Sequence, residues 1–237
     1  MTKKILVTGF PHCGTTLLRA LVGNCKNVYD QDREFSEPQN YRADMPFDFY
    51  VWKHPFLHRE FRDYGFQHKP NTKLKDTIII PIIRNPWNVF TSLHKRSLKD
   101  GTFSVMDDKQ GHSIPYYINA AHRVYEAMEN PIEGVYPIRY EDMFDNDFEK
   151  LKTIFDSIGL EYDDSTFTND TKKFKHNSIT LKDGYDGTLE DNVYDVQYRI
   201  WQINQPIQNM NSEINVPDEI NERLQKFEIL KKLKYLE

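Results

Sequence analysis

Cysteines are scarce in this sequence, long apolar runs are absent, and positive charge is not in excess. Only Cys13 and Cys25 occur among 237 residues, which excludes a disulfide framework and favours a reducing, cytoplasmic setting. No stretch reaches the roughly 20 apolar residues of a membrane helix. The start, MTKKILVTGFP, has a basic pair but its apolar run breaks at Gly9 and Pro11, so we expect neither a signal peptide nor a transmembrane segment. With 31 Lys and Arg against 36 Asp and Glu, the net charge of −5 argues against a general nucleic-acid partner, although it allows a local basic pocket.

Short apolar segments alternate with segments whose apolar residues have helical spacing. The expected strands are residues 3–8, 47–54, 77–83 and 134–140, and the expected helices are 15–22, 85–98, 113–130, 145–160 and 216–236. Residues 26–48 are polar and are expected to be irregular. The run 77–83 suits a buried parallel strand, although Pro81 is unfavourable inside a central strand. Strands that alternate with helices imply an α/β protein with a three-layer parallel sheet flanked by helices, which we expect to be a single domain over 1–237.

A glycine-bounded loop follows the first expected strand and leads into the first expected helix. It reads Gly9-Phe-Pro-His-Cys-Gly14-Thr15-Thr16, which has the Gly-x4-Gly spacing of a phosphate-binding P-loop. Backbone N–H groups of such a loop and of the helix N-terminus face an anion. Thr15 stands where the lysine of an ATP- or GTP-binding loop is usual, and the run 77–83 ends in Arg84-Asn85-Pro86 rather than in a magnesium-binding Asp. These departures favour a phosphate ester that is bound without a metal.

Three motifs in this order resemble those of the sulfotransferase superfamily, whose members take a sulfuryl group from 3′-phosphoadenosine 5′-phosphosulfate (PAPS). The family's 5′-phosphosulfate loop is similar to Pro11-His12-Cys13-Gly14-Thr15-Thr16, its 3′-phosphate motif to Arg84-Asn85-Pro86 followed by Ser92, and a later motif to Tyr140-Glu141-Asp142. The resemblance implies a P-loop NTPase-like sulfotransferase fold. It also implies an enzyme that moves the sulfuryl group from PAPS to a hydroxyl or amine acceptor by in-line displacement, with 3′,5′-ADP (PAP) as the product and no metal. The family's Gly-rich C-terminal motif has a weak candidate in Lys182-Asp183-Gly184.

The resemblance also assigns the residues that bind the donor. It places the 5′-phosphate and the sulfate at the loop residues Pro11, His12, Cys13, Gly14, Thr15 and Thr16, through backbone N–H groups and the threonine hydroxyls. Arg84 and Ser92 would bind the 3′-phosphate, and the planar guanidinium fork of arginine suits phosphate oxygens. Tyr140 would lie near the adenine, or else be an ordinary core tyrosine at a strand end. Cys13 stands where a small residue is needed, and we interpret it as packing rather than nucleophilic.

Catalytic roles are implied for His12, Lys53, His54 and Glu34. His12 stands where the family usually has Lys or Arg, and a histidine can balance charge on the bridging oxygen only when protonated or as a hydrogen-bond donor. Lys53 is an alternative cation, because VWKHPF at 51–56 is similar both to Lys-Asp-Pro-Phe of protein-tyrosine sulfotransferases and to Lys-x-His-x-Pro of cytosolic ones. We rank His54 first as the general base, Glu34 second and Asp32 third, and each of them could instead have a solvated or structural role.

Two other classes of function stay open on the sequence. A P-loop nucleotide kinase or NTPase shares the glycine loop, but Thr15 in place of lysine and Arg84 at the end of the apolar run do not fit that class. Magnesium dependence would identify it. A non-catalytic nucleotide-binding module is supported by His12 in place of the basic residue. The acceptor is expected to be a small molecule or a carbohydrate, with a peptide as the alternative. Other histidines, such as His58, His68 and His94, show no paired metal-ligand spacing, so no metal is expected.

Overall fold

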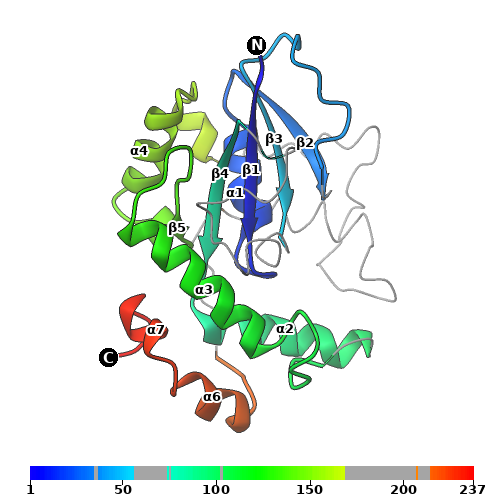
Figure 1. The fold of residues 1–237 in the computed structure, drawn as a ribbon, viewed down its shortest axis with the longest axis vertical. Coiled ribbons are helices and arrows are strands. Elements are labelled where there is room, and N and C mark those ends of the chain that lie inside the picture. Colours follow the sequence, from blue (N-terminus) through cyan, green and yellow to red (C-terminus); the bar gives the residue numbers. More distant parts are fainter. Residues whose placement is uncertain (35–36, 56–73, 75, 102–103, 169–206, 208–213) are drawn as a thin grey trace.

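The computed structural model describes residues 1–34, 37–55, 74, 76–101, 104–168, 207 and 214–237. Within these residues, a five-stranded sheet has the order β2-β3-β1-β4-β5. Its strands are β1 (Lys3–Gly9), β2 (Val28–Glu34), β3 (Phe49–His54), β4 (Thr77–Ile83) and β5 (Ile138–Arg139). Neighbouring strands are all parallel, so their carboxyl ends meet at one edge of the sheet. The predicted α/β class with a parallel sheet is confirmed (Figure 1).

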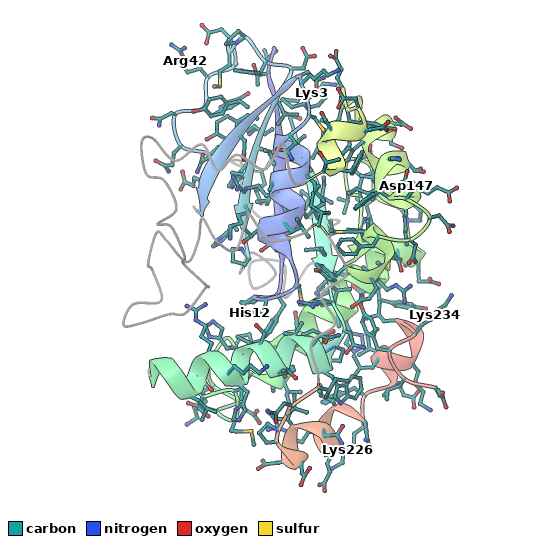
Figure 2. The ribbon with its side chains drawn as sticks, turned by 180° about the vertical axis from the view of Figure 1, so that it is seen from behind. Lys3, His12, Arg42, Asp147, Lys226 and Lys234 are labelled. Carbon is teal, nitrogen blue, oxygen red and sulfur yellow. The ribbon has the colours of Figure 1, made fainter. Side chains whose placement is uncertain are left out.

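Helices cover both faces of this sheet. The helices of the described part are α1 (Thr15–Gly23), α2 (Pro86–Asp100), α3 (Ile114–Glu129), α4 (Glu149–Ile158), α6 (Asp218–Leu224) and α7 (Glu228–Lys232), with short 3₁₀ turns at Glu141–Met143 and Asp164–Phe167. α1 packs against β1, β2 and β3, and α3 packs against β4. Figures 1 and 2, which view the molecule from opposite sides, show α1 and α3 on different faces of the sheet.

Successive residues of β1 and β3 pack in different hydrophobic clusters. Ile5 and Val7 belong to the larger hydrophobic cluster, which α1 joins, whereas Leu6 and Trp52 pack with Ala127 of α3 in a smaller cluster. This alternation follows from the pleat of a strand, in which neighbouring side chains point to opposite faces. The last two residues of β3 are Lys53 and His54, for which the family resemblance implies catalytic roles, and their side chains therefore also point to different faces.

The prediction that residues 26–48 are irregular is wrong in part, because Val28–Glu34 forms the edge strand β2. Its sequence, VYDQDRE, is mostly polar, so its pattern did not indicate a strand. A polar contact holds it instead: the buried Arg19 of α1 donates to Asp30 Oδ1 at 2.5 Å and to the Gln31 carbonyl at 2.9 Å. A buried guanidinium needs such partners, so helix and edge strand are bound together.

Pro81 does lie inside β4, a central strand, and the sheet accommodates it. Ile79, two residues earlier, donates its backbone N–H to Gly134 O at 2.8 Å, on the side of β5. Pro81 faces the same side, since alternate residues of a strand direct their backbone groups the same way. Its position falls between the isolated Ile79–Val135 bridge and the pairs of β5, where the ladder is interrupted. The missing N–H of proline therefore removes no ladder hydrogen bond.

Two predicted elements differ in extent. The expected strand 134–140 is reduced to Ile138–Arg139. The expected helix 216–236 is divided into α6 and α7, because Phe227 adopts an extended conformation with φ −100° and ψ 110°. The break lets α6 pack against α2 while α7 packs against α3.

Candidate active site at the carboxyl edge of the sheet

The glycine loop lies at the carboxyl end of β1, and Figure 2 shows His12 there, close to α2. β1 ends at Gly9, where a Cβ would lie 2.3 Å from the Ile82 carbonyl oxygen, so the absence of a side chain allows the close approach of β4. His12 and Gly14 both have positive φ, at 65° and 92°. Only glycine adopts such a conformation freely, which explains the second glycine of the loop and marks His12 as held in place by its surroundings.

The N-terminus of α1 opens toward this loop without a side-chain cap. Gly14 is the N-cap residue, and the first turn contains no acidic residue. Leu18 N donates to Gly14 O at 3.0 Å, which leaves the N–H groups of residues 15–17 outside the helical ladder. These groups and the helix dipole give the loop the partial positive charge that binds an anion.

Tyr140 connects the loop to Arg84. A Cβ on Gly14 would lie 2.4 Å from Tyr140 Cδ2, so the ring is in close contact with the loop. The guanidinium carbon of Arg84 lies 4.2 Å from the centroid of the same ring, which is a cation–π contact. The Arg84 carbonyl accepts a hydrogen bond from the Tyr117 hydroxyl at 2.7 Å. Arg84, which directly follows β4, is thus held beside the loop, where it can meet a second anionic group.

Two more predicted residues reach the loop through their side chains. Lys53 Nζ donates to Thr16 Oγ1 at 2.7 Å, and Lys53 is only 5% exposed. His12 Nδ1 lies 2.6 Å from Ser92 Oγ of α2, within hydrogen-bond distance. The structure therefore brings the loop, Lys53, Ser92, Arg84 and Tyr140 together at one edge of the sheet.

Cys13 is fully buried within the loop. Burial raises the pKa of its thiol to about 12, although the nearby Arg84 opposes this shift. Such a thiol stays protonated near neutral pH and is a poor nucleophile, which favours the packing role.

The groups that hold the β4–α2 turn were not identified from the sequence. Asn85 is the N-cap of α2, and its Oδ1 accepts from Trp87 N at 3.0 Å. Glu141 accepts from Asn85 N at 2.8 Å through Oε1 and from the Tyr235 hydroxyl at 3.0 Å through Oε2. The Tyr-Glu-Asp motif singled out Glu141, but its partners are 56 and 94 residues away, so no local pattern could indicate these bonds.

The candidate bases lie at the ends of β2 and β3. Glu34 pairs with Lys53 in backbone register, after a shift in the β2–β3 ladder between Asp30 and Glu34. His54 is partly exposed, and its carbonyl accepts from Thr8 Oγ1 at 2.8 Å. Strand geometry directs its side chain to the face opposite that of Lys53. The structure thus separates two residues that are adjacent in the sequence, although both remain at the carboxyl edge.

Some predicted features receive no further support from the structure. Asp32 lies within β2, and the weak candidate Lys182-Asp183-Gly184 lies outside the described residues. In the described part of the chain, no group of three or more His, Cys, Asp or Glu residues could hold a metal ion. Among the residues placed by the structure, no helix has the length and apolar character needed to cross a membrane.

Comparison with known proteins identifies the class to which this fold and loop belong. The model of the sulfotransferase domain family matches residues 2–186. The chain therefore belongs to the sulfotransferase domain family, as its motifs predicted, and this membership sets aside the nucleotide kinase alternative.

Two solved structures are similar in fold. Mouse sulfotransferase SULT7A1 complexed with PAP has a TM-score of 0.57 and 15% identity, over 99% of this chain and 89% of that one. The sulfotransferase domain from the curacin biosynthetic pathway has a TM-score of 0.51 and 12% identity, over 100% of this chain and 99% of that one. No curated protein sequence matches the chain.

Proposed function

We propose that this protein transfers a sulfuryl group from PAPS to a hydroxyl or amine acceptor. The observation that carries the proposal is the meeting of the uncapped α1 N-terminus, the buried Lys53 and Arg84 at one edge of the sheet. A donor with a 5′-phosphosulfate at one end and a 3′-phosphate at the other matches two neighbouring groups of positive charge. Mouse SULT7A1, which is similar in fold, was solved in complex with PAP, and we extend that ligand to this chain.

The proposed donor site has two halves. Backbone N–H groups of residues 12–16, with the hydroxyls of Thr15 and Thr16, would hold the 5′ end. Arg84 and Ser92 would hold the 3′-phosphate. The half-buried guanidinium is already oriented by the Tyr140 ring, so less of its conformational freedom is lost on binding.

The side chains around the loop have distinct parts in the proposed transfer. PAPS, when bound, supplies the sulfuryl group and the phosphate leaving group. Lys53, which donates a hydrogen bond to Thr16, would neutralise negative charge that builds on the leaving oxygen, and His12 would donate a hydrogen bond there. The base removes the acceptor proton as the acceptor bonds to sulfur. We assign this base to His54, with Glu34 as the alternative supported by its register with Lys53.

The proposal is tested by incubating the full-length protein with radiolabelled PAPS and a panel of phenols, alcohols, sugars, amines and tyrosine peptides. We propose a small molecule or a carbohydrate as the acceptor, and a peptide as the alternative. A labelled product that requires both protein and acceptor would support the transferase. Binding of PAP without transfer to any acceptor would favour a non-catalytic module, the second candidate, which His12 supports because it replaces the family's basic residue.

Replacing Arg84 by alanine is expected to raise the Kd of PAP about 10–100-fold, because charge-assisted hydrogen bonds to phosphate are among the stronger ones. The Kd of adenosine 5′-monophosphate (AMP), which lacks the 3′-phosphate, should stay nearly unchanged. Calorimetric titration measures both. Arg42→Ala is the matched control, since its side chain is 74% exposed and Figure 2 shows it at the opposite end of the sheet from His12. Equal losses for PAP and AMP would contradict the assignment of Arg84 to the 3′-phosphate.

A further inference from the structure

We propose that Glu141, held by Tyr235 of the C-terminal segment, is a positioning residue for the half of the donor site that binds the 3′-phosphate. The C-terminal segment is defined here as residues 214–237, which lie beyond residues 2–186 matched by the family model. The inference rests on the proposed function, because it assumes that Arg84 and Ser92 meet a phosphate group.

Glu141 completes the N-terminal cap of α2 from a distant part of the chain. In a capping box, a Glu or Gln three residues after the N-cap accepts a hydrogen bond from the N-cap backbone N–H. The N-cap of α2 is Asn85, and Asn88 stands at that third position. The Asn85 N–H donates instead to Glu141 Oε1 at 2.8 Å. A carboxylate at this place also interacts favourably with the helix dipole.

This cap fixes the two residues that are proposed to bind the 3′-phosphate. Arg84 directly precedes the N-cap, and Ser92 lies on α2 itself. The Tyr117 hydroxyl donates to the Arg84 carbonyl at 2.7 Å, and Glu141 accepts from the Asn85 N–H. Both polar groups of the peptide between Arg84 and Asn85 are therefore hydrogen-bonded. A shift of Glu141 would therefore move the guanidinium and the start of α2 together.

Tyr235 holds the carboxylate from the other side. Its hydroxyl donates to Glu141 Oε2 at 3.0 Å. Burial raises the pKa of Tyr235 well above its ordinary value, so the hydroxyl keeps the proton that it donates. Its backbone is anchored too, because Tyr235 N donates to Leu230 O at 2.8 Å and Arg139 Nη1 donates to Leu233 O at 2.8 Å.

The C-terminal segment also bonds to α2 directly. Trp87 Nε1 donates to Asn221 Oδ1 of α6 at 2.8 Å, and Asn215 N donates to Thr91 Oγ1 at 3.0 Å. Figure 1 shows α6 and α7 beside α2 and α3, at the end of the molecule where the strands terminate. The C-terminal segment thus holds in place α2 and the β4–α2 turn, which carry the proposed phosphate ligands.

The test compares the affinities of PAP and AMP for the full-length protein by calorimetry. Tyr235→Phe removes only the hydroxyl and is expected to raise the Kd of PAP about threefold to tenfold, in keeping with one hydrogen bond, while the Kd of AMP stays nearly constant. Tyr162→Phe is the matched control, because the Tyr162 hydroxyl donates to Asp156 at 2.9 Å on the surface near α4. Glu141→Ala should weaken PAP more than Glu141→Gln, because the amide oxygen of glutamine can still accept from Asn85 N.

Two results would overturn the inference. In the first, Tyr235→Phe loses affinity for PAP and AMP equally, which would indicate general loosening of the fold. In the second, the Kd of PAP for Tyr235→Phe equals that for Tyr162→Phe, which would show no link between Tyr235 and the donor site. If the unaltered protein does not prefer PAP to AMP, the donor assignment itself fails and the inference fails with it. A preference for PAP that Tyr235→Phe leaves intact refutes the inference alone.

Discussion

Replacing His54 by alanine is expected to lower kcat by about 10²–10⁴-fold, the usual contribution of a general base, with little change in the Kd of PAP. His54 ends β3 at the carboxyl edge of the sheet, and its carbonyl is fixed by the Thr8 hydroxyl at 2.8 Å. Its imidazole is therefore carried by a rigid strand end rather than by a free loop. The measurement is the rate of sulfated product at saturating PAPS, alongside calorimetry with PAP.

Glu34→Gln is the matching variant, because Glu34 pairs in register with Lys53 and is the second candidate for the base. Glutamine keeps the size of the side chain but cannot take up the acceptor proton. If His54→Ala retains the kcat of the unaltered protein while Glu34→Gln loses turnover, the base is Glu34 and our first assignment is wrong. A loss of PAP affinity in His54→Ala equal to the loss of kcat would also contradict a role in proton transfer.

Lys53→Met is expected to lower kcat by about 10²–10³-fold, the typical cost of removing one group that stabilises developing charge. Lys53 is 5% exposed, and its ammonium donates to Thr16 at the start of α1. Methionine fills similar space without the charge. Because Lys53→Met also removes the hydrogen bond to Thr16, Tm should fall by the equivalent of about 1.5–3 kcal/mol, the usual contribution of one hydrogen bond from a charged group.

Lys26→Met serves as the control for this variant, since the Lys26 side chain is 64% exposed and pairs with Asp163. It should keep both kcat and Tm. Thermal unfolding and steady-state rates on the same samples separate the two effects of Lys53→Met. Full turnover in Lys53→Met would remove Lys53 from the transfer step and leave His12 as the remaining candidate for stabilising the developing charge.

The parts of the site that could be predicted from the sequence are those encoded in short local patterns. The glycine loop could be identified from two glycines between an expected strand and an expected helix. The structure shows why both glycines are needed, because Gly9 lies against the Ile82 carbonyl and Gly14 has a φ of 92°. Arg84 was identifiable because it directly follows the most apolar run of the chain. These features depend on residues that are close together in the sequence, so a local pattern can reveal them.

The rest depends on contacts between distant segments. The strand β2 was not predicted because its sequence has no hydrophobic pattern that would indicate a strand. An ion pair between Arg19 of α1 and Asp30 of β2 holds it instead. The hydrogen bond between His12 and Ser92 joins residues that are 80 positions apart, and the bond between Glu141 and Tyr235 spans 94. By contrast, the separation of Lys53 and His54 onto different faces could have been predicted, because the expected strand 47–54 ends where β3 ends and adjacent side chains of a strand point to opposite faces.

The measurement that tests the central claim most directly is thermal unfolding of the full chain with PAP, ADP and ATP, each with and without Mg²⁺. A donor site built from the α1 N-terminus, Lys53 and Arg84 predicts stabilisation by PAP that needs no metal. A ligand at 100 times its Kd adds about 2.7 kcal/mol to the free energy of unfolding, which is readily seen as a rise in Tm. A preference for ATP with Mg²⁺, and no effect of PAP, would contradict the account.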